Sequence, residues 1–302
     1  MSSALAVPAA QRLRTYASFV RFEHTLFSLP LVLAGVFSAP GRALGAGRWG
    51  LIALAAVGAR TAAMSLNRLI DRRLDALNPR TRVRELPAGR MRTAEGMALL
   101  VASAAAYLAA CAALGPWFLK VAAIPLGVFA LYPWLKRFTP LCHLGVGAAL
   151  ALAPLAGFAA AHPDLAAWRP AAALAAFAFC WVSGFDVIYA TLDEDFDRGH
   201  GVHSLVAWLG RARALRVSWA LHVAAMAALG AAGLLLAGGP GAARLAPLWA
   251  VLAAATFAGV CALLALEQRC AENVDLAFFR INVWVGAGVF ALVLCLRLRA
   301  GA

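Results

Sequence analysis

The sequence predicts an all-α, polytopic membrane protein with nine transmembrane helices. Of its 302 residues, 63% are hydrophobic and only 14% are charged. Soluble domains average roughly 45–50% apolar and about 25% charged residues, so this excess indicates that lipid is the main solvent of the chain. Only helices and closed barrels satisfy their backbone hydrogen bonds in lipid. The apolar runs are too long and continuous for barrel strands, which favours helices.

Nine apolar stretches account for the expected helices, each close to the roughly 20 residues that a membrane helix needs. They are Phe22–Pro40, Gly50–Leu69, Glu95–Leu114, Pro116–Trp134, Leu141–Ala161, Pro170–Ala190, Ala214–Ala237, Ala246–Leu266 and Phe278–Leu296. The loops between them are too short to hold a large soluble domain. Residues 1–302 are therefore expected to form a single transmembrane domain, with residues 1–20 as a cytoplasmic N-terminal segment.

The distribution of charge predicts the orientation in the membrane. With the N-terminus in the cytoplasm, 19 of the 27 Lys and Arg residues fall in cytoplasmic segments, 7 fall on the opposite side and Arg60 lies within a span. This bias favours a cytoplasmic N-terminus and an external C-terminus in a bacterial plasma (inner) membrane. Topology and the anionic lipid bilayer also explain the net charge of +13, so nucleic acid is not an expected partner. The acidic residues also lie on the cytoplasmic side, where 13 of the 14 fall, and Asp164 is the exception.

Two acidic motifs stand at the ends of the second and sixth spans. They are Asn67-x3-Asp71-x3-Asp75, the first acidic motif, and Tyr189-x3-Asp193-x3-Asp197, the second. Spacings of four residues place side chains on one face of a helix. Asp186, seven residues before Asp193, shares that face and is a candidate to support an acceptor substrate. The matching positions indicate a weak internal repeat of two four-helix halves plus a ninth helix, which would set the motifs opposite each other.

A row of carboxylates at a membrane helix end predicts a cation site. Ionisable groups at this depth cost several kcal/mol unless they are paired. Mg2+ binds oxygen ligands and typically uses one or two carboxylates together with phosphates and water. A run of charges that merely caps a helix is the alternative for either motif alone, but two matching motifs favour Mg2+ and, through it, a diphosphate.

A diphosphate also requires cationic side chains. Arginine binds phosphate through two parallel bonds and lysine acts as a point charge. The candidates beside the acidic motifs are Arg68, Arg72, Lys136 and Arg137, whereas Arg73, Arg80, Arg82 and Arg84 are expected to contact lipid or form a loop lid. Arg21 and His24, near the start of the first span, are candidates to support an acceptor substrate, with a purely structural role as the alternative.

Three segments resemble one known family. Asn67-Arg-Leu-Ile-Asp71-Arg-Arg-Leu-Asp75 and Asp186-Val-Ile-Tyr189-Ala-Thr-Leu-Asp193-Glu-Asp-Phe-Asp197 resemble the two motifs of the UbiA superfamily of intramembrane prenyltransferases, and Tyr132-Pro-x-x-Lys136-Arg137 resembles a further segment. The resemblance implies a helical bundle around a cavity open to lipid. It implies that Mg2+ and a polyprenyl diphosphate are bound by Asn67, Asp71, Asp75, Asp193 and Asp197, with Arg72, Lys136, Tyr132 and Tyr189 near the phosphates. It assigns catalytic roles to Asp71, Asp75, Asp193 and Asp197.

The same resemblance implies a reaction and an acceptor class. The prenyl C1 would be ionised or displaced and then attacked by an electron-rich aromatic carbon. Segments such as Phe22-Glu-His-Thr-Leu-Phe27 and Phe138-Thr-Pro-Leu-Cys-His143 are similar to 4-hydroxybenzoate polyprenyltransferase-like members, some of which prenylate 1,4-dihydroxy-6-naphthoate in menaquinone biosynthesis. This chain has His203 where the commoner ubiquinone enzymes carry lysine. A prenyltransferase acting on a haem or chlorin-type acceptor and a cation-coupled transporter are the alternatives.

Overall fold

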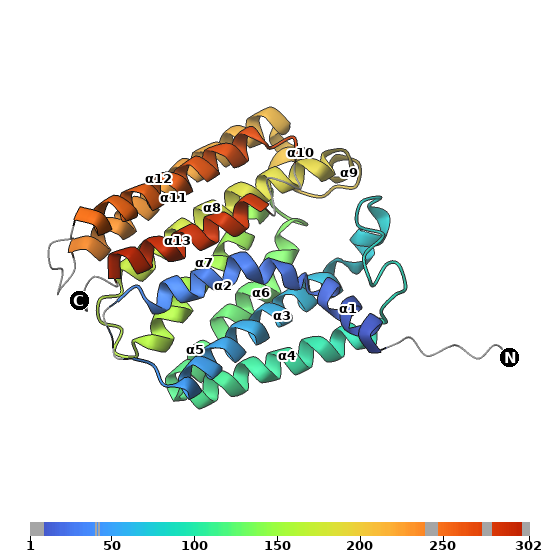
Figure 1. Cartoon of the computed structure of the whole chain (residues 1–302). Helices are drawn as coiled ribbons and strands as arrows, with labels where there is room; N and C mark the ends of the chain where they lie inside the picture. The colour runs from blue at the N-terminus through green and yellow to red at the C-terminus, as the bar shows by residue number, and fades with distance from the viewer. Residues whose placement is uncertain (1–8, 40, 42, 239–246, 274–279, 298–302) are drawn as a thin grey trace.

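The computed structural model describes residues 9–39, 41, 43–238, 247–273 and 280–297, and these residues contain helices and no strand. The helices form one elongated bundle (Figure 1). They are α1 (Ala9–Phe19), η1 (Phe22–His24), α2 (Thr25–Val36), α3 (Ala46–Leu77), α4 (Thr93–Leu114), α5 (Pro116–Val121), α6 (Ala123–Leu135), α7 (Cys142–Ala161), α8 (Arg169–Ala190), η2 (Thr191–Asp193), α9 (Glu194–Gly199), α10 (Leu205–Leu209), α11 (Arg211–Gly238), α12 (Pro247–Arg269) and α13 (Asn282–Arg297).

Seven helical segments in the described residues are long and apolar enough to cross a membrane. They are Ala46–Leu77, Thr93–Leu114, Pro116–Leu135, Cys142–Ala161, Arg169–Gly199, Arg211–Gly238 and Leu248–Arg269. The all-α membrane class is confirmed. The nine-span count stays a prediction, because its first and ninth helices, α2 and α13, have only 12 and 16 residues.

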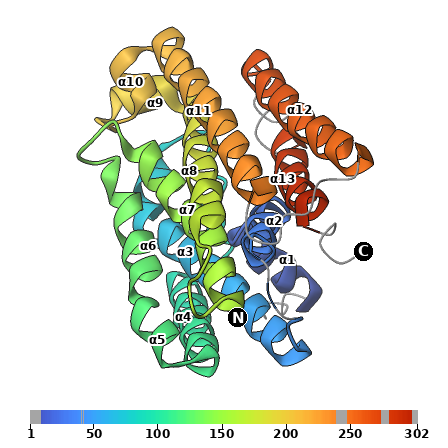
Figure 2. The same ribbon diagram turned by 90° about the vertical axis from the view of Figure 1, so that its left-hand side faces the viewer.

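Helix α8 lies at the centre of the bundle. It packs against α7 and α11, while α2 packs against α7 and α13, and α3 packs against α4 and α6 (Figure 2). Of the apolar window of α8, 67% is buried, against 33% or less for the other candidate spans. The aromatic side chains of Phe177 and Trp181 stack within this buried face. The acidic end of α8 is therefore held by neighbours on several sides.

Glycines permit the closest helix contacts. A Cβ added at Gly35 of α2 would lie 2.0 Å from the carbonyl oxygen of Pro154, and one at Gly157 of α7 would lie 2.1 Å from that of Val32. Backbones can approach this closely only where side chains are absent, a common feature of membrane helix interfaces. These contacts fix α2 against α7.

The two acidic motifs lie at the same end of the bundle as α1, α9 and α10 (Figure 1). Helix α3 continues to Leu77, so the first motif is helical throughout, beyond the predicted end of the span at Leu69. The second motif does not lie on one continuous helix as its spacing predicted, because α8 ends at Ala190 and a 3-10 turn follows. The Thr191 hydroxyl donates to the Ile188 carbonyl at 2.7 Å and so competes with the regular helix.

Candidate active site

A cavity of about 220 Å³ lies where the ends of the two acidic motifs meet. Its walls come from α3, α6, α7, α8 and the two connections that follow the motifs. Five carboxylates line it, those of Asp71, Asp75, Asp186, Asp193 and Asp197, together with three cationic side chains, those of Arg80, Arg84 and Lys136. The structure thus brings the two motifs to opposite walls of one polar cavity, as the internal repeat predicted.

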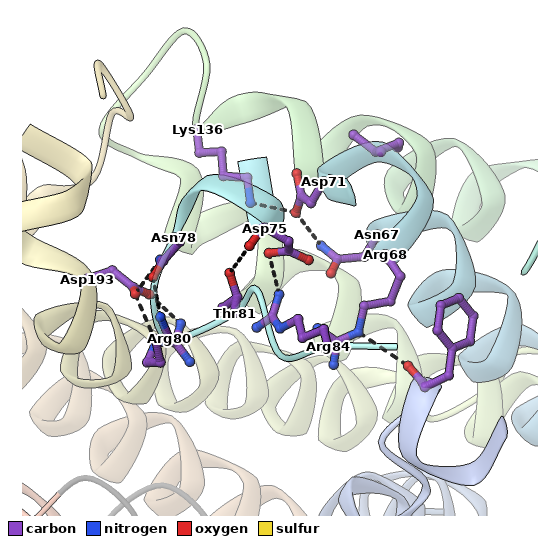
Figure 3. Close-up of polar contacts among 12 residues, drawn as sticks. Asn67, Arg68, Asp71, Asp75, Asn78, Arg80, Thr81, Arg84, Lys136 and Asp193 are labelled. Atoms are coloured by element: carbon purple, nitrogen blue, oxygen red, sulfur yellow. Dashed lines mark hydrogen bonds and ion pairs between the residues drawn. The ribbon is translucent and has the colours of Figure 1, made fainter. Parts of the chain in front are cut away.

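The first acidic motif is paired with the end of α6. Asp71 is only 1% exposed, and Lys136 Nζ lies 2.5 Å from its Oδ2. Arg137 Nη1 lies 3.4 Å from Oδ1 of the same carboxylate, and Asn67 Nδ2 lies 3.4 Å from Oδ2. Both cations predicted beside this motif from the segment Tyr132 to Arg137 are therefore in contact with it. Figure 3 shows Lys136 pointing toward Asp71.

The connection from Asn78 to Arg92 joins the two motifs. Asn78 Nδ2 donates to Asp193 Oδ1 at 2.7 Å, and Arg80 Nε donates to the same oxygen at 2.9 Å while its Nη2 pairs with Oδ2. Arg84 Nη1 donates to Asp75 at 2.7 Å. Figure 3 shows Asn78 and Arg80 pointing toward Asp193 and Arg84 toward Asp75. The prediction that Arg80 and Arg84 contact lipid is therefore wrong, because both pair with carboxylates of the motifs, and a lid role for their loop stays a prediction.

Arg80 is also held by an aromatic partner. Its Nη1 donates to the Tyr189 hydroxyl at 2.7 Å, and its guanidinium carbon lies 4.8 Å from the centre of the Tyr189 ring. Burial alone lowers the pKa of Arg80, but the hydrogen bonds and charges of Asp193 and Tyr189 outweigh it and raise this pKa above the ordinary value. Arg80 is therefore a permanent cation in the cavity wall.

Local side-chain bonds fix this connection to the end of α3. Asn78 is the C-cap residue of α3, and its Oδ1 accepts a hydrogen bond from the backbone N–H of Arg80 at 2.9 Å, the bond of an Asx turn. Thr81 Oγ1 donates to the Asp75 carbonyl at 3.1 Å. From α1, Ser18 Oγ donates to Glu85 Oε1 at 2.6 Å. In the sequence, the segment Asn78-Pro-Arg-Thr81 is the feature that could have indicated this turn, because its turn-forming residues follow shortly after the first motif.

A histidine pairs with the remaining carboxylate of α8. His143 Nδ1 lies 2.6 Å from Asp186 Oδ2, and the backbone N–H of Leu205 donates to His143 Nε2 at 3.3 Å. Asp186 was predicted to support the acceptor, and it lines the cavity. Asp197 is buried and has no cation within ion-pair distance in the described part of the chain.

Several predicted site residues lie outside the cavity wall. Arg68 is buried and donates from Nε to the Phe19 carbonyl at 3.3 Å, whereas Arg72 is exposed and donates to the Leu69 carbonyl of its own helix. Arg21 pairs with Glu23 at 3.3 Å. The side chain of His24 lies outside the described part of the structure. Roles for these four residues stay predictions, whereas Tyr132 and Tyr189 do line the cavity.

One further cation stands within a membrane span. Arg60 of α3 lies seven residues before Asn67, and its Nη2 donates to the Arg21 carbonyl at 3.3 Å. Its Nε is buried without a hydrogen-bond partner, and it has no carboxylate partner among the described residues. A charge at this depth is costly and commonly marks a functional site.

The donors in the cavity suit Mg2+ held jointly with phosphate. Within the described residues, no three His, Cys, Asp or Glu side chains gather closely enough to hold a metal by themselves. Mg2+ does not require such a cage, since it usually takes one or two carboxylates, substrate phosphates and water. With five carboxylates against three cations, a bound diphosphate would add negative charge to an acidic cavity. Divalent cations on Asn67, Asp71, Asp75, Asp193 and Asp197 would offset that charge.

Comparisons with known proteins agree with this arrangement. The model of the UbiA prenyltransferase family matches residues 28–294. The 4-hydroxybenzoate octaprenyltransferase of Cupriavidus necator is 33% identical over 297 residues, which cover 93% of this chain and 96% of that protein. The apo structure of a UbiA homolog from Aeropyrum pernix K1 is 34% identical with a TM-score of 0.77, covering 90% of this chain and 97% of that one.

A more distant structure shares the fold. The UbiA homolog from Archaeoglobus fulgidus bound to GPP and Mg2+ has a TM-score of 0.65 at 19% identity, covering 92% of this chain and 99% of that one. At this identity the likeness concerns the architecture alone. The helical bundle described above is therefore a shared fold.

Proposed function

The chain belongs to the UbiA prenyltransferase family, and we propose on this basis that it transfers a polyprenyl group from a polyprenyl diphosphate to a phenolic aromatic acid. The acceptor would be of the 4-hydroxybenzoate or 1,4-dihydroxy-6-naphthoate type, which places the reaction in ubiquinone or menaquinone biosynthesis. Family membership makes the chain an integral membrane prenyltransferase. The metal, the acceptor and the individual residue roles belong to the proposal.

One observation carries the proposal, namely the cavity in which two acidic motifs face each other across three cations. Negative charge grows on the diphosphate as the bond to prenyl C1 breaks, so groups that stabilise this charge lower the barrier. Arg80, Arg84 and Lys136 are already in the cavity wall, each beside a carboxylate that a metal would take over. These cations would then turn to the phosphate oxygens.

The metal would contribute Lewis-acid stabilisation of the departing diphosphate when bound. The carboxylates and amide of the two motifs would hold it, as the donor chemistry of the cavity allows. Leu74, Pro133 and Val146 add apolar surface to the cavity wall. Such a wall excludes water from an electron-poor prenyl C1 and protects it from hydrolysis.

Arg60 supports an acidic acceptor. Its Nε is buried without a partner, so a carboxylate brought in by the substrate would satisfy both its charge and its hydrogen-bonding capacity. The cavity is small, about 220 Å³ against roughly 300–1,000 Å³ for typical ligand sites. A compact aromatic acid suits this space better than the macrocycle of the haem or chlorin alternative. The transporter alternative loses support because the elements that carry the two acidic motifs lie at one end of the bundle (Figure 1) and the family is one of prenyltransferases.

The proposed topology follows from the positive-inside bias. The site would face the cytoplasm of a bacterium, together with α1 and the connections after the two motifs. Reagents that label only externally accessible thiols would test it with single cysteines placed at Asp164 and at Arg82. Labelling of Asp164→Cys alone would support the proposal, and labelling of Arg82→Cys alone would reverse the topology.

Product formation in lipid nanodiscs tests the reaction. The purified protein would receive a polyprenyl diphosphate, Mg2+ and each acid separately, and chromatography would detect the prenylated ring. We expect Asp71→Ala and Asp193→Ala to abolish the product, because each removes a carboxylate from one motif. Asp164→Ala, an exposed acid far from the cavity, is the matched control and should leave the rate unchanged. Full activity in both motif variants would refute the metal assignment.

A further inference from the structure

Asp186 differs from the other carboxylates of the cavity in its partner. Asp71, Asp75 and Asp193 each form an ion pair with a lysine or an arginine. Asp186 bonds to His143, and its side chain is 24% exposed, open to the cavity that it lines. A carboxylate that is not neutralised by a permanent cation keeps its capacity to accept a proton.

The hydrogen bonds around His143 define how it serves Asp186. The backbone N–H of Leu205 donates to Nε2, so Nε2 carries a lone pair and the proton of the neutral ring resides on Nδ1. Nδ1–H then donates to Asp186 Oδ2 at 2.6 Å. With the ring only 3% exposed and bonded at both nitrogens, His143 fixes one carboxylate oxygen and leaves the other, Oδ1, for a substrate.

We propose that Asp186 is the catalytic base that removes the phenolic proton of the acceptor, and that His143 is the positioning residue that orients it. The inference rests on the proposed function and adds a residue role to it. Proton removal makes the ring carbon beside the phenolic oxygen more nucleophilic, so it attacks prenyl C1. A base placed in this way typically contributes roughly 10²–10⁴-fold to a rate.

The step balances as follows. The phenolic proton passes to the Asp186 carboxylate, the carbon–carbon bond to prenyl C1 forms, and the C1–oxygen bond breaks with its electron pair leaving on the diphosphate. The ring carbon then gives up its hydrogen as a proton, and the phenolic oxygen regains one, which restores the aromatic ring. One proton per turnover is released to water from Asp186.

The surroundings of Asp186 fit a phenol that also carries a carboxylate. Asp186 and Tyr132 both line the cavity, and Arg60 lies on α3 seven residues before Asn67, which lines the same cavity. An acceptor between Asp186 and Arg60 would direct its phenol to Asp186 and its acid group to Arg60. His143 of α7 contacts Asp186 directly. The other charged and titratable side chains that line the cavity with Asp186 are those of Asp71, Asp75, Arg80, Arg84, Tyr132, Lys136, Cys142, Tyr189, Asp193 and Asp197. His222 of α11 lies against Gly184, two residues before Asp186.

Asp186→Asn tests the base, because it keeps the shape of the side chain and a carbonyl that accepts from His143. With 4-hydroxybenzoate we expect kcat to fall at least 100-fold and the KM for polyprenyl diphosphate to stay within threefold. A fluorinated 4-hydroxybenzoate ionises at lower pH and needs less help from a base. With it, the deficit of Asp186→Asn should shrink tenfold or more, and raising the pH with the ordinary acceptor should also restore rate.

His143 variants separate positioning from folding. His143→Ala should lower kcat about tenfold without changing the KM for polyprenyl diphosphate, whereas His143→Asn, whose amide can still donate to Asp186, should stay within threefold of wild type. The inference would be overturned, and the proposed function would stand, if Asp186→Asn kept a kcat within threefold of wild type. The same holds if the deficit of Asp186→Asn were equal on both acceptors. No product from the wild-type protein with any acid would overturn the proposed function, and the inference with it.

Discussion

Replacement of Arg80 by lysine keeps the positive charge of the cavity and removes its planar fork. In the structure the fork donates from Nε and Nη2 to Asp193 and from Nη1 to Tyr189. The stacking contact with the Tyr189 ring, at 4.8 Å, depends on the same planar group. Lysine offers a single ammonium on a flexible chain, so it replaces at most part of this network.

The size of the effect follows from the bonds that are lost. A hydrogen bond to a charged partner contributes about 1.5–3 kcal/mol, and the 28% exposure of the Arg80 side chain argues for the lower part of that range. Loss of one or two such bonds to a diphosphate amounts to about 2–3 kcal/mol. At about 1.4 kcal/mol per factor of ten, kcat/KM for polyprenyl diphosphate should fall roughly 30- to 150-fold.

Initial rates of prenyl transfer over a range of polyprenyl diphosphate concentrations would measure this fall. Arg82→Lys is the matched control, because Arg82 lies two residues away on the same connection, is exposed, and its side chain forms no hydrogen bond or ion pair in the described structure. Thermal unfolding of both variants would verify that each still folds. Equal rates for Arg80→Lys and Arg82→Lys would refute the placement of Arg80 at the diphosphate.

Three other substitutions test the cavity and the fold. Lys136→Met leaves the buried carboxylate of Asp71 without its ammonium partner, so kcat/KM for polyprenyl diphosphate should fall at least about 100-fold. Ser18→Ala removes the bond by which α1 holds Glu85 in the connection after the first motif, so the KM for polyprenyl diphosphate should rise about three- to tenfold while kcat changes little. Gly147→Val would place a Cβ 2.1 Å from Ser183 Oγ and should destabilise the protein by about 1–3 kcal/mol, measured as a lower Tm in detergent.

Each of these variants has a matched control in the chain. Lys120→Met removes an exposed lysine at the end of α5, and Thr15→Ala removes a hydroxyl of α1 that donates only to the Gln11 carbonyl. Gly127→Val adds side-chain atoms where nothing lies within 4 Å of the new Cβ. A control that changes as much as its partner variant would contradict the role assigned to Lys136, Ser18 or Gly147, respectively.

The composition and the acidic motifs carried most of what could be predicted. An apolar excess specifies a helical membrane bundle because lipid leaves the backbone few other solutions. The spacing of Asp71 and Asp75 and the neighbouring Lys136 predicted one wall of the cavity, since residues four apart share a helix face. Both predictions depend on local patterns of residue type and spacing, which can be recognised directly in a sequence.

The contacts made by the connecting segments that follow the two acidic motifs could not be predicted in the same way. Arg80 and Arg84 belong to a basic segment, and basic residues next to a membrane span usually contact lipid, so that interpretation was reasonable but wrong. Their contacts depend on the turn at Asn78, which carries the chain back across the cavity. The pairing of His143 with Asp186 joins residues 43 positions apart on different helices, and no local spacing encodes it.

The helix boundaries at α2 mark another limit of sequence reading. The apolar run Phe22–Pro40 predicted one continuous span, yet the structure divides it between a 3-10 helix at Phe22–His24 and α2, which ends at Val36. The run Phe278–Leu296 begins outside the described residues, so its length stays a prediction. Hydropathy counts apolar residues and is insensitive to the turn that divides them. Helix boundaries are accordingly the least certain part of such predictions.

The central claim is that the two acidic motifs hold a metal-bound diphosphate from which the prenyl group leaves. The most direct measurement follows diphosphate and prenylated acid together in nanodiscs, first with a chelator and then as Mg2+ is added back. The account predicts no product in the chelator and, with Mg2+, one diphosphate released for each ring prenylated. Prenylated acid formed at an undiminished rate without any divalent cation would contradict it.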